Sequence, residues 1–212
     1  MGETVDEAKE YYSLTIRVWH ILAPFYDIMT MPLSRVREQV VDFANAMKGS
    51  KILDVATGTG EQALAFARNG YDVIGVDLSE DMLRVAERKN SFGNAKFEVA
   101  DATNLPFEDD SFDVTCISFA LHDMPSTIRE KVLRQIARVT KPKGMVLIVD
   151  YGLPRSKVGR FVVYHLVNLY EGKYYSRFIK SDLVPLLRKT GIEVSEERPV
   201  LLGAGRILKG TK

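Results

Sequence analysis

The sequence predicts an α/β fold built on a doubly wound, mainly parallel sheet, and three observations lead to this prediction. Five short, almost continuously apolar runs lie between residues 51 and 150 and alternate with amphipathic helical patterns. Such runs are typical of parallel strands covered by helices on both sides, and right-handed crossovers make the sheet doubly wound. Two further strands with a very short connection close the chain, which favours an antiparallel pair.

Each predicted element rests on a local pattern. The strands are apolar runs, and the helices place apolar residues three and four positions apart. Ser79 is typical of a helix N-cap, and Lys-Pro-Lys-Gly ends the helix that follows the fourth strand. The expected strands are 51–56, 72–77, 95–100, 112–119, 145–150, 193–198 and 201–209, and the expected helices are 61–70, 79–90, 126–140 and 181–189.

We expect a single domain over residues 1–212, because a chain of this length suits one core. Residues 1–48 hold two helical patterns and should form an N-terminal helical cap. Residues 49–152 should form the ligand-binding core. A helical insertion rich in Tyr and Phe is expected at 153–180, and the last helix and the antiparallel strand pair at 181–212.

Composition excludes several classes of protein. The chain carries 29 Lys and Arg against 28 Asp and Glu, so its net charge of +1 gives no bulk attraction for nucleic acid. Cys116 is the single cysteine, which rules out a disulfide framework and disfavours a thiolate metal site. The polar, acidic start does not resemble a signal peptide, and no apolar run reaches ~18 residues. We therefore expect a cytoplasmic protein without a metal or a membrane span, whose membrane contact would be peripheral; its oligomeric state stays open.

A glycine-rich turn marks the first candidate site. The first strand runs into Asp54-Val-Ala-Thr-Gly-Thr-Gly60, and a helix begins at once. Gly58 and Gly60 permit a tight turn and close backbone approach, and the helix N-terminus offers free N–H groups. The residues Gly58 to Ala63 also match the dinucleotide-binding motif G-x-G-x-x-A. A plain strand-to-helix turn would need the same glycines.

Three carboxylates at successive strand ends refine this site. Asp77 can accept both hydroxyls of a ribose, and Asp101 can bind an exocyclic amine. Either of them could instead serve turn chemistry. Asp54 precedes the turn and Glu61 begins the helix, so both would repel a pyrophosphate and attract a cationic group. The pattern favours an adenosine with a positively charged amino-acid tail over NAD.

The motifs resemble those of the class I S-adenosylmethionine-dependent methyltransferases. ILDVATGTGEQA is similar to their first motif, VIGVDLSEDML to the second, and FEVADATNLPFEDDSFDVTCISFALHDM to the third and fourth. Together with APFYDIMTMPLS, they resemble most closely the ubiquinone/menaquinone-biosynthesis C-methyltransferases and their small-molecule relatives, over about residues 24–152. The resemblance implies a Rossmann-like sheet of seven strands with the last one antiparallel. It also implies S-adenosylmethionine as cofactor and S-adenosylhomocysteine as product.

The same resemblance implies roles for individual residues of the donor site. It places the methionine part at Gly58, Thr59 and Gly60, near Asp54, with Ser118 beside it. The ribose falls to Asp77, and the adenine falls to Leu78, Met82, Asp101 and Ala102. The chain departs from the quinone enzymes at Thr57, where they have a glycine, at His122-Asp123, where they commonly have Arg-Asn, and in the insertion 155–179.

The acceptor side is expected beyond the fourth strand, because ligands of open α/β sheets lie over the carboxyl ends of the strands. His122 and Asp123 follow that strand and could orient or deprotonate an acceptor; His122 could also simply pack in its loop. Tyr26 lies in a segment that resembles the family's cover over the cofactor. Tyr174 and Tyr175 are adjacent, so that one can pack while the other faces a pocket. His165 is expected to be structural, and Arg35, Arg37, Arg155, Lys157 and Arg160 are expected on solvated faces.

The sequence thus predicts an S-adenosylmethionine-dependent methyltransferase that acts on a small or lipid-like acceptor by in-line displacement. A general base would be needed only if the acceptor is not already a thiolate, a phenolate or a neutral amine. Two alternatives stay open at this point. One is an NAD-dependent oxidoreductase, which the sequence disfavours because it shows no Tyr-x-x-x-Lys motif. The other is a cofactor-binding protein without catalysis.

Overall fold

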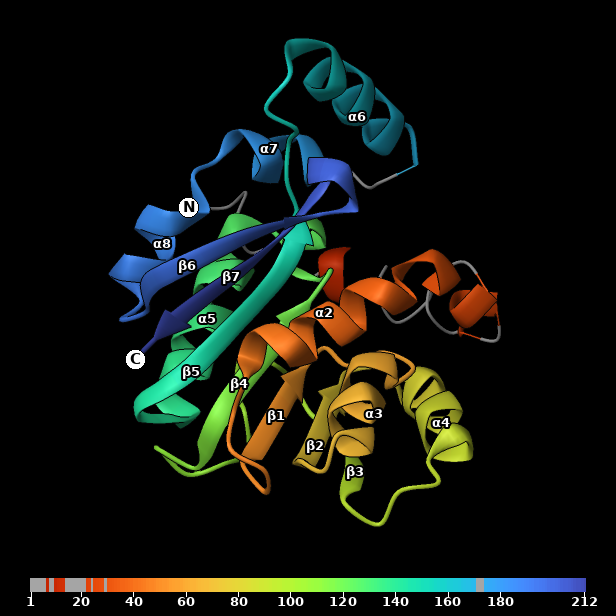
Figure 1. The fold of residues 1–212 in the computed structure, drawn as a ribbon, viewed down its shortest axis with the longest axis vertical. Coiled ribbons are helices and arrows are strands. Elements are labelled where there is room, and N and C mark those ends of the chain that lie inside the picture. Colours follow the sequence, from red (N-terminus) through yellow and green to blue (C-terminus); the bar gives the residue numbers. More distant parts are fainter. Residues whose placement is uncertain (1–6, 8–9, 14–21, 24, 29, 171–173) are drawn as a thin grey trace.

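The computed structural model describes residues 7, 10–13, 22–23, 25–28, 30–170 and 174–212. Its centre is one seven-stranded sheet with the strand order β3-β2-β1-β4-β5-β7-β6 (Figure 1). Neighbouring strands are parallel from β3 to β5, and β7 runs antiparallel to both β5 and β6. The predicted doubly wound sheet with an antiparallel last strand is confirmed. The strands are β1 Lys51–Val55, β2 Asp72–Asp77, β3 Ala95–Val99, β4 Phe112–Ser118, β5 Thr140–Tyr151, β6 Glu193–Val200 and β7 Gly205–Thr211.

Side chains alternate between the two faces of the sheet and divide the core in two. Ile52 and Cys116 point to the face covered by α2 and α3, whereas Leu53 and Ile117 point to the face covered by α5, α7 and α8. This alternation explains why the central strands are apolar throughout. The helices are α2 Ser34–Ala44, α3 Glu61–Arg68, α4 Glu80–Lys89, α5 Ser126–Val139, α6 Lys157–Tyr170, α7 Tyr175–Lys180 and α8 Leu183–Lys189, with short 3₁₀ turns η1 Met31–Leu33, η2 Leu121–Asp123 and η3 Leu201–Gly203.

Two strands begin four or five residues away from the predicted position, whereas the other strand boundaries agree within two residues. β5 begins at Thr140 rather than at 145, because the chain passes directly from α5 into the strand and a register irregularity between Phe112 and Val114 absorbs the extra residues. β7 begins at Gly205 rather than at 201, because Leu201 and Leu202 have positive φ angles and form the η3 turn. Neither shift moves the residues of the predicted site.

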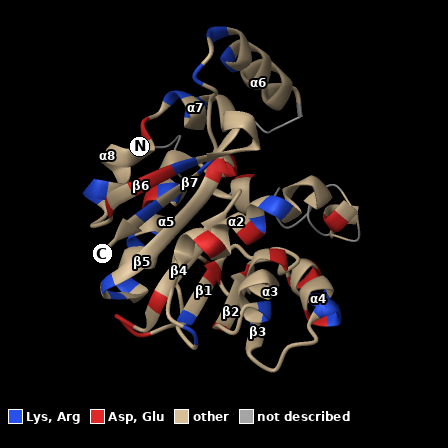
Figure 2. Cartoon of the chain, viewed as in Figure 1, with Lys and Arg blue, Asp and Glu red and all other residues tan. Residues whose placement is uncertain are grey.

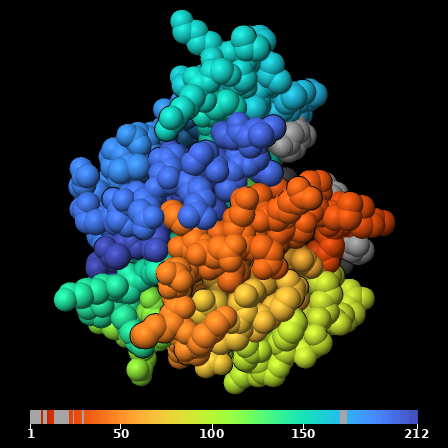
Figure 3. Space-filling model, in the orientation of Figure 1, coloured from red at the N-terminus to blue at the C-terminus, as the bar shows by residue number. Residues whose placement is uncertain are grey.

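The insertion after β5 forms a separate lobe. α6 leaves the carboxyl end of β5 and projects beyond the sheet, and α7 returns the chain to it (Figures 1 and 3). Basic but no acidic side chains lie on α6 (Figure 2). Among the helices that the structure describes, none combines the length and the apolar character needed to cross a membrane.

Candidate functional site

The predicted site residues gather along one edge of the sheet, where the parallel strands end. In the order of the sheet, Asp101 follows β3, Asp77 ends β2, and the glycine turn follows β1. Ser118 ends β4, and Asp150 lies near the end of β5. The strand order reverses between β1 and β4, and this switch point is where ligands bind in open α/β sheets. Most donor candidates lie on one side of it, whereas the donor candidate Ser118 and the acceptor candidates His122 and Asp123 lie on the other.

The two glycines of the turn serve different purposes. Gly60 is the N-cap of α3 and has a φ of +77°, and a Cβ there would come within 2.8 Å of atoms of Ala86 and Phe97. Its missing side chain is therefore required by packing inside the protein. Gly58 has a φ of +57°, and a Cβ there would approach only Met82 at 3.7 Å and Tyr26 at 4.0 Å. Gly58 is the glycine that leaves its backbone accessible to a ligand.

Asp77 joins the end of β2 to the glycine turn. Its Oδ2 accepts a hydrogen bond from the Gly58 N–H at 2.8 Å, and its Oδ1 accepts one from the Ser79 N–H at 2.9 Å. Burial raises the pKa of Asp77, and the backbone donors of Ser79, Gly58 and Leu78 oppose this shift. Each carboxylate oxygen can accept a second hydrogen bond, so turn chemistry and ribose binding are compatible at this residue.

Asp54 lies beneath the turn and is only 1% exposed. Its Oδ2 accepts a hydrogen bond from the Thr57 hydroxyl at 2.5 Å, and the Ala63 backbone of α3 also donates to the carboxylate. Thr57, which stands where the family has a glycine, thus supplies a hydrogen-bond donor to the buried Asp54 carboxyl group. Burial raises the pKa of Asp54 to about 7, and the nearby Asp77 charge adds to the shift. Asp54 therefore braces the turn and is partly protonated near neutrality.

We expect the raised pKa of Asp54 to make the cofactor-free protein less stable as pH rises from about 4 to about 7. In that window the unfolded carboxyl is ionised while the folded one keeps its proton; above pH 7 the loss is complete. Over the whole window it amounts to on the order of 4 kcal/mol, at about 1.4 kcal/mol per pKa unit. Asp54→Asn should remove this slope from urea unfolding curves, whereas Asp42→Asn, on an exposed position of α2, should keep it. An unchanged slope in Asp54→Asn would contradict the assignment.

Asp101 is held by its own loop and by the N-terminal segment. The Thr103 N–H and hydroxyl both donate to Oδ1 at 2.8 Å, which is turn chemistry. The Tyr12 hydroxyl donates to both oxygens, at 3.0 and 3.2 Å. An adenine amine would share the carboxylate with Tyr12, a residue that sequence reasoning did not select. Leu78 and Ala102, the other residues predicted at the adenine, are partly buried beside these strand ends.

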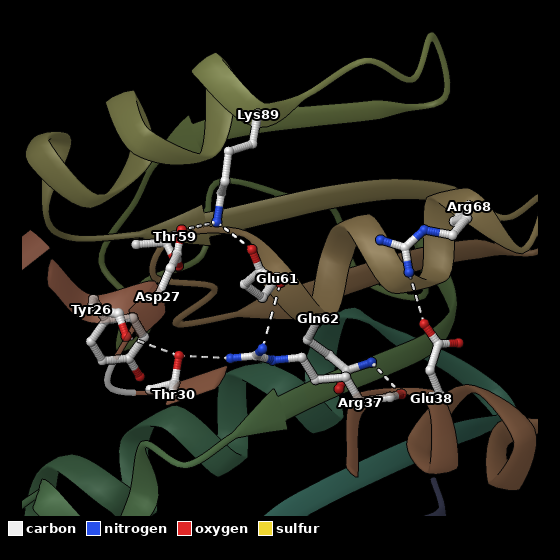
Figure 4. A network of polar contacts seen from close by, with 10 residues as sticks. All are labelled: Tyr26, Asp27, Thr30, Arg37, Glu38, Thr59, Glu61, Gln62, Arg68 and Lys89. Atoms are coloured by element: carbon white, nitrogen blue, oxygen red, sulfur yellow. Dashed lines mark hydrogen bonds and ion pairs between the residues drawn. The ribbon is translucent and has the colours of Figure 1, made fainter. Parts of the chain in front are cut away.

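A chain of polar contacts ties the N-terminal segment over the glycine turn (Figure 4). Asp27 accepts from the Thr59 hydroxyl at 2.5 Å and pairs with Lys89 of α4 at 2.6 Å. Lys89 also pairs with Glu61 at 2.5 Å, and Arg37 approaches Glu61 at 3.5 Å. This arrangement explains how Tyr26 comes to lie next to Gly58, at the donor turn rather than in the aromatic cluster of the insertion.

The same contacts correct two sequence-based interpretations. The Arg37 side chain is 14% exposed and donates to the Thr30 hydroxyl at 2.9 Å, so the prediction that it lies on a solvated face is wrong. The charge of Glu61 is balanced by Lys89 and Arg37, so the argument that Glu61 repels a pyrophosphate loses its force. Both errors arise because the partners are 24 and 28 residues away in sequence, where no local pattern reveals them.

His122 forms a buried pair with Asp150. Its Nδ1 lies 2.8 Å from Asp150 Oδ1, and its backbone N–H donates to Oδ2 at 3.1 Å. Since a carboxylate only accepts, Nδ1 carries a proton in this pair, and in the neutral ring Nε2 is then the basic nitrogen. Asp150 also accepts from the Tyr151 N–H at 2.7 Å. The pair joins the ends of β4 and β5, and Asp123 follows His122 as the last residue of η2.

Aromatic rings and a buried arginine surround this pair. The Tyr151 ring lies 4.7 Å from the His122 ring and 5.3 Å from that of Tyr175. Arg129 of α5 donates to the carbonyls of residues 121 and 124, each at 2.9 Å, and stacks 4.8 Å from Phe178. The insertion thus meets the loop of His122, since the Phe178 ring of α7 lies 6.3 Å from the His122 ring. Tyr174 and Tyr175 are both almost fully covered.

Two residues of this region were missed by sequence reasoning although each left a signal. Asp150 ends the apolar run MVLIVD, as Asp77 ends DVIGVD. Arg129 occupies a position on the apolar face of α5, four residues before Leu133. Asp27 belongs to the segment Phe25-Tyr26-Asp27, whose resemblance to the family's cover over the cofactor the sequence did show. Ser118 was selected, and its hydroxyl lies 3.5 Å from the Cys116 thiol. The residues that the structure describes contain no group of three or more His, Cys, Asp or Glu suited to a metal ion.

Comparison with known proteins places the chain in a family. A family model described as a methyltransferase domain matches residues 52–144. The chain is 35% identical over 190 residues to a demethylmenaquinone methyltransferase of Geobacillus kaustophilus, covering 84% of this chain and 76% of that protein. A demethylmenaquinone methyltransferase of Thermotoga maritima is 30% identical over 221 residues, which cover 92% of this chain and 94% of that protein. A solved methyltransferase of Aquifex aeolicus shares the fold, with a TM-score of 0.66 at 19% identity and coverage of 82% of this chain and 88% of that one.

The match to other relatives is more limited. The chain spans about half the length of two curated relatives that are 40% and 39% identical to it, namely 53% and 56%. The resemblance found in the motifs is nevertheless confirmed, and the dinucleotide alternative is not favoured. The chain belongs to the class I S-adenosylmethionine-dependent methyltransferases, in the family that contains the demethylmenaquinone methyltransferases.

Proposed function

We propose that this protein transfers a methyl group from S-adenosylmethionine to a ring carbon of a lipid-like quinol. The observation that carries the proposal is the His122–Asp150 pair, buried among aromatic rings across the switch point from the glycine turn. The names of the family relatives support it, since they describe demethylmenaquinone methyltransferases. A cytoplasmic location and the absence of a nucleic-acid partner remain predictions.

The donor side fits S-adenosylmethionine. Gly58 leaves an open backbone position between Met82 and Tyr26, and Asp77 reaches the same turn with carboxylate oxygens that have acceptor capacity. In this assignment Gly58, Thr59 and Gly60 hold the methionine part, Asp77 the ribose, and Asp101 with Leu78, Met82 and Ala102 the adenine. Asp54 supports the turn from below. The bound cofactor supplies an electrophilic methyl group on a sulfonium.

The acceptor side provides a base and an apolar enclosure. The ring carbon of a quinol becomes a stronger nucleophile when a neighbouring hydroxyl loses its proton. His122 accepts that proton at Nε2, and Asp150 stabilises the imidazolium that forms. Methyl transfer from the cofactor to this carbon would leave S-adenosylhomocysteine; the ring proton would then pass to solvent, and His122 would return its proton to the ring oxygen as aromaticity is restored. Tyr151, which is partly exposed, is the ring proposed to lie beside the acceptor, with the buried Tyr175 packed behind it, and Asp123, Tyr26 and Tyr174 remain candidates for orienting the acceptor.

The proposal is tested by a transfer assay with radiolabelled S-adenosylmethionine. The acceptors are reduced demethylmenaquinone, the same compound kept oxidised, and phosphoethanolamine as an amine control. We expect label on the ring carbon of the reduced quinone, far less with the oxidised form, and none on the amine. Label on the amine alone, or no transfer to the quinol by protein that binds S-adenosylhomocysteine, would refute the proposal.

A further inference from the structure

The helix α6 turns its apolar face toward solvent, which is the reverse of a normal surface helix. Val158, Phe161, Val162, Leu166 and Leu169 are 76, 66, 45, 59 and 85% exposed. Their spacing places them on a single stripe along the helix. Val167, on the opposite side, is 6% exposed. An exposed apolar stripe of this extent marks an interaction surface.

The charges around this stripe are strongly one-sided. Residues 155–180 contain six Lys and Arg and one Glu, a net charge of +5. Since the whole chain has a net charge of +1, the remaining residues carry −4. Lys157 and Arg160 lie on α6 itself and are exposed, and Figure 2 shows basic side chains without acidic ones on this helix. The stripe therefore sits within the basic part of a chain that is otherwise acidic.

The surface lies next to the acceptor side of the site. α6 begins six residues after Tyr151, whose ring contacts His122, and it projects as a lobe from that edge of the molecule (Figure 3). The ring of Tyr164, on the inner side of α6, lies 6.4 Å from that of Tyr175. A molecule bound to the outer face of α6 is therefore separated from the aromatic rings around His122 by the thickness of this helix.

We infer that α6 docks the protein on an anionic phospholipid bilayer, with the helix lying in the plane of the interface. Its 14 residues correspond to about 21 Å of helix, too short to span the bilayer. An apolar stripe without acidic residues, on a helix whose other side carries Lys157 and Arg160, is the pattern of interfacial helices that bind anionic lipids. The inference goes beyond the proposed function. It depends on that function in one respect: docking would let the protein collect a lipid-like acceptor from the membrane.

The test measures co-sedimentation of the full chain with vesicles that contain no acceptor. One set is pure phosphatidylcholine, and the other is phosphatidylcholine mixed with phosphatidylglycerol. We expect binding to the mixed vesicles that high salt weakens, and little binding to phosphatidylcholine alone. Lys157→Gln with Arg160→Gln should lower the partition coefficient by roughly 25-fold, at about fivefold per basic residue. Phe161→Ser with Leu166→Ser should lower it by roughly a hundredfold, since two apolar side chains no longer enter the interface.

Matched controls lie elsewhere on the surface. Met47→Gln and Lys131→Gln change an exposed apolar and an exposed basic residue away from α6 and should leave binding unchanged. Every variant must bind S-adenosylhomocysteine like the wild type, which shows that it is folded.

Equal loss of vesicle binding in the controls, or no recruitment of the wild type to mixed vesicles, would overturn the inference. So would a dimer in light scattering that the Phe161→Ser, Leu166→Ser variant converts to monomer, because the stripe would then be covered by a second copy. Vesicle binding without methyl transfer to the quinol would instead refute only the proposed function.

Discussion

Replacing Asp77 with alanine is expected to weaken binding of S-adenosylhomocysteine by about a hundredfold, because the ribose loses charge-assisted hydrogen bonds worth about 1.5–3 kcal/mol each. Titration calorimetry measures the affinity directly. Asp77→Asn keeps an amide oxygen that can still accept from the Gly58 N–H, so we expect a smaller loss. Asp72→Ala, at the exposed beginning of the same strand, should bind normally. Unchanged affinity in a folded Asp77→Ala protein would remove Asp77 from the donor site.

Replacing His122 with alanine is expected to lower turnover by about 100–10,000-fold while affinity for S-adenosylhomocysteine stays the same, as for a general base that does not hold the donor. Asp150→Asn should also lower turnover, because the imidazolium loses its carboxylate. It should in addition change the pH dependence of kcat/KM, whereas a purely structural role would lower activity equally at every pH. His165→Ala, an exposed histidine on α6, should be fully active on a short-chain, water-soluble acceptor. Full activity of His122→Ala would leave the residue with a packing role.

The sheet could be predicted because burial on both faces leaves a direct mark on the sequence. KILDVA, DVIGVD and MVLIVD are continuous apolar runs, and each ends in or near an acidic residue at the same edge. The glycine turn could be predicted because positive φ angles at residues 58 and 60 favour glycine, and at Gly60 packing against Ala86 and Phe97 leaves no room for a side chain. These are local constraints, and local constraints can be read from one sequence.

The contacts between distant segments could not be predicted in this way. Asp27 and Lys89 are 62 residues apart, and the Tyr12 hydroxyl reaches Asp101 across 89 residues. In the sequence each of these residues is indistinguishable from an ordinary surface residue, and only the folded structure shows which residue it contacts. The burial of Tyr175 could not be predicted from the sequence either. Its ring is fully covered, so Tyr175→Ala would leave a cavity costing about 3–5 kcal/mol, by analogy with other large aromatic truncations, and would confuse a binding effect with unfolding.

The strand order separates the two halves of the site along the chain as well as in space. Apart from Ser118, the donor candidates come from the continuous stretch between residues 54 and 102, and the acceptor candidates beyond the switch point come from residues 122 to 175. A segment exchanged after β5 would therefore replace most of the acceptor enclosure and leave the cofactor turn intact. Grafting the insertion of a relative with a different acceptor after Tyr151 would test whether this segment sets the choice of acceptor, because the graft point lies outside the donor site.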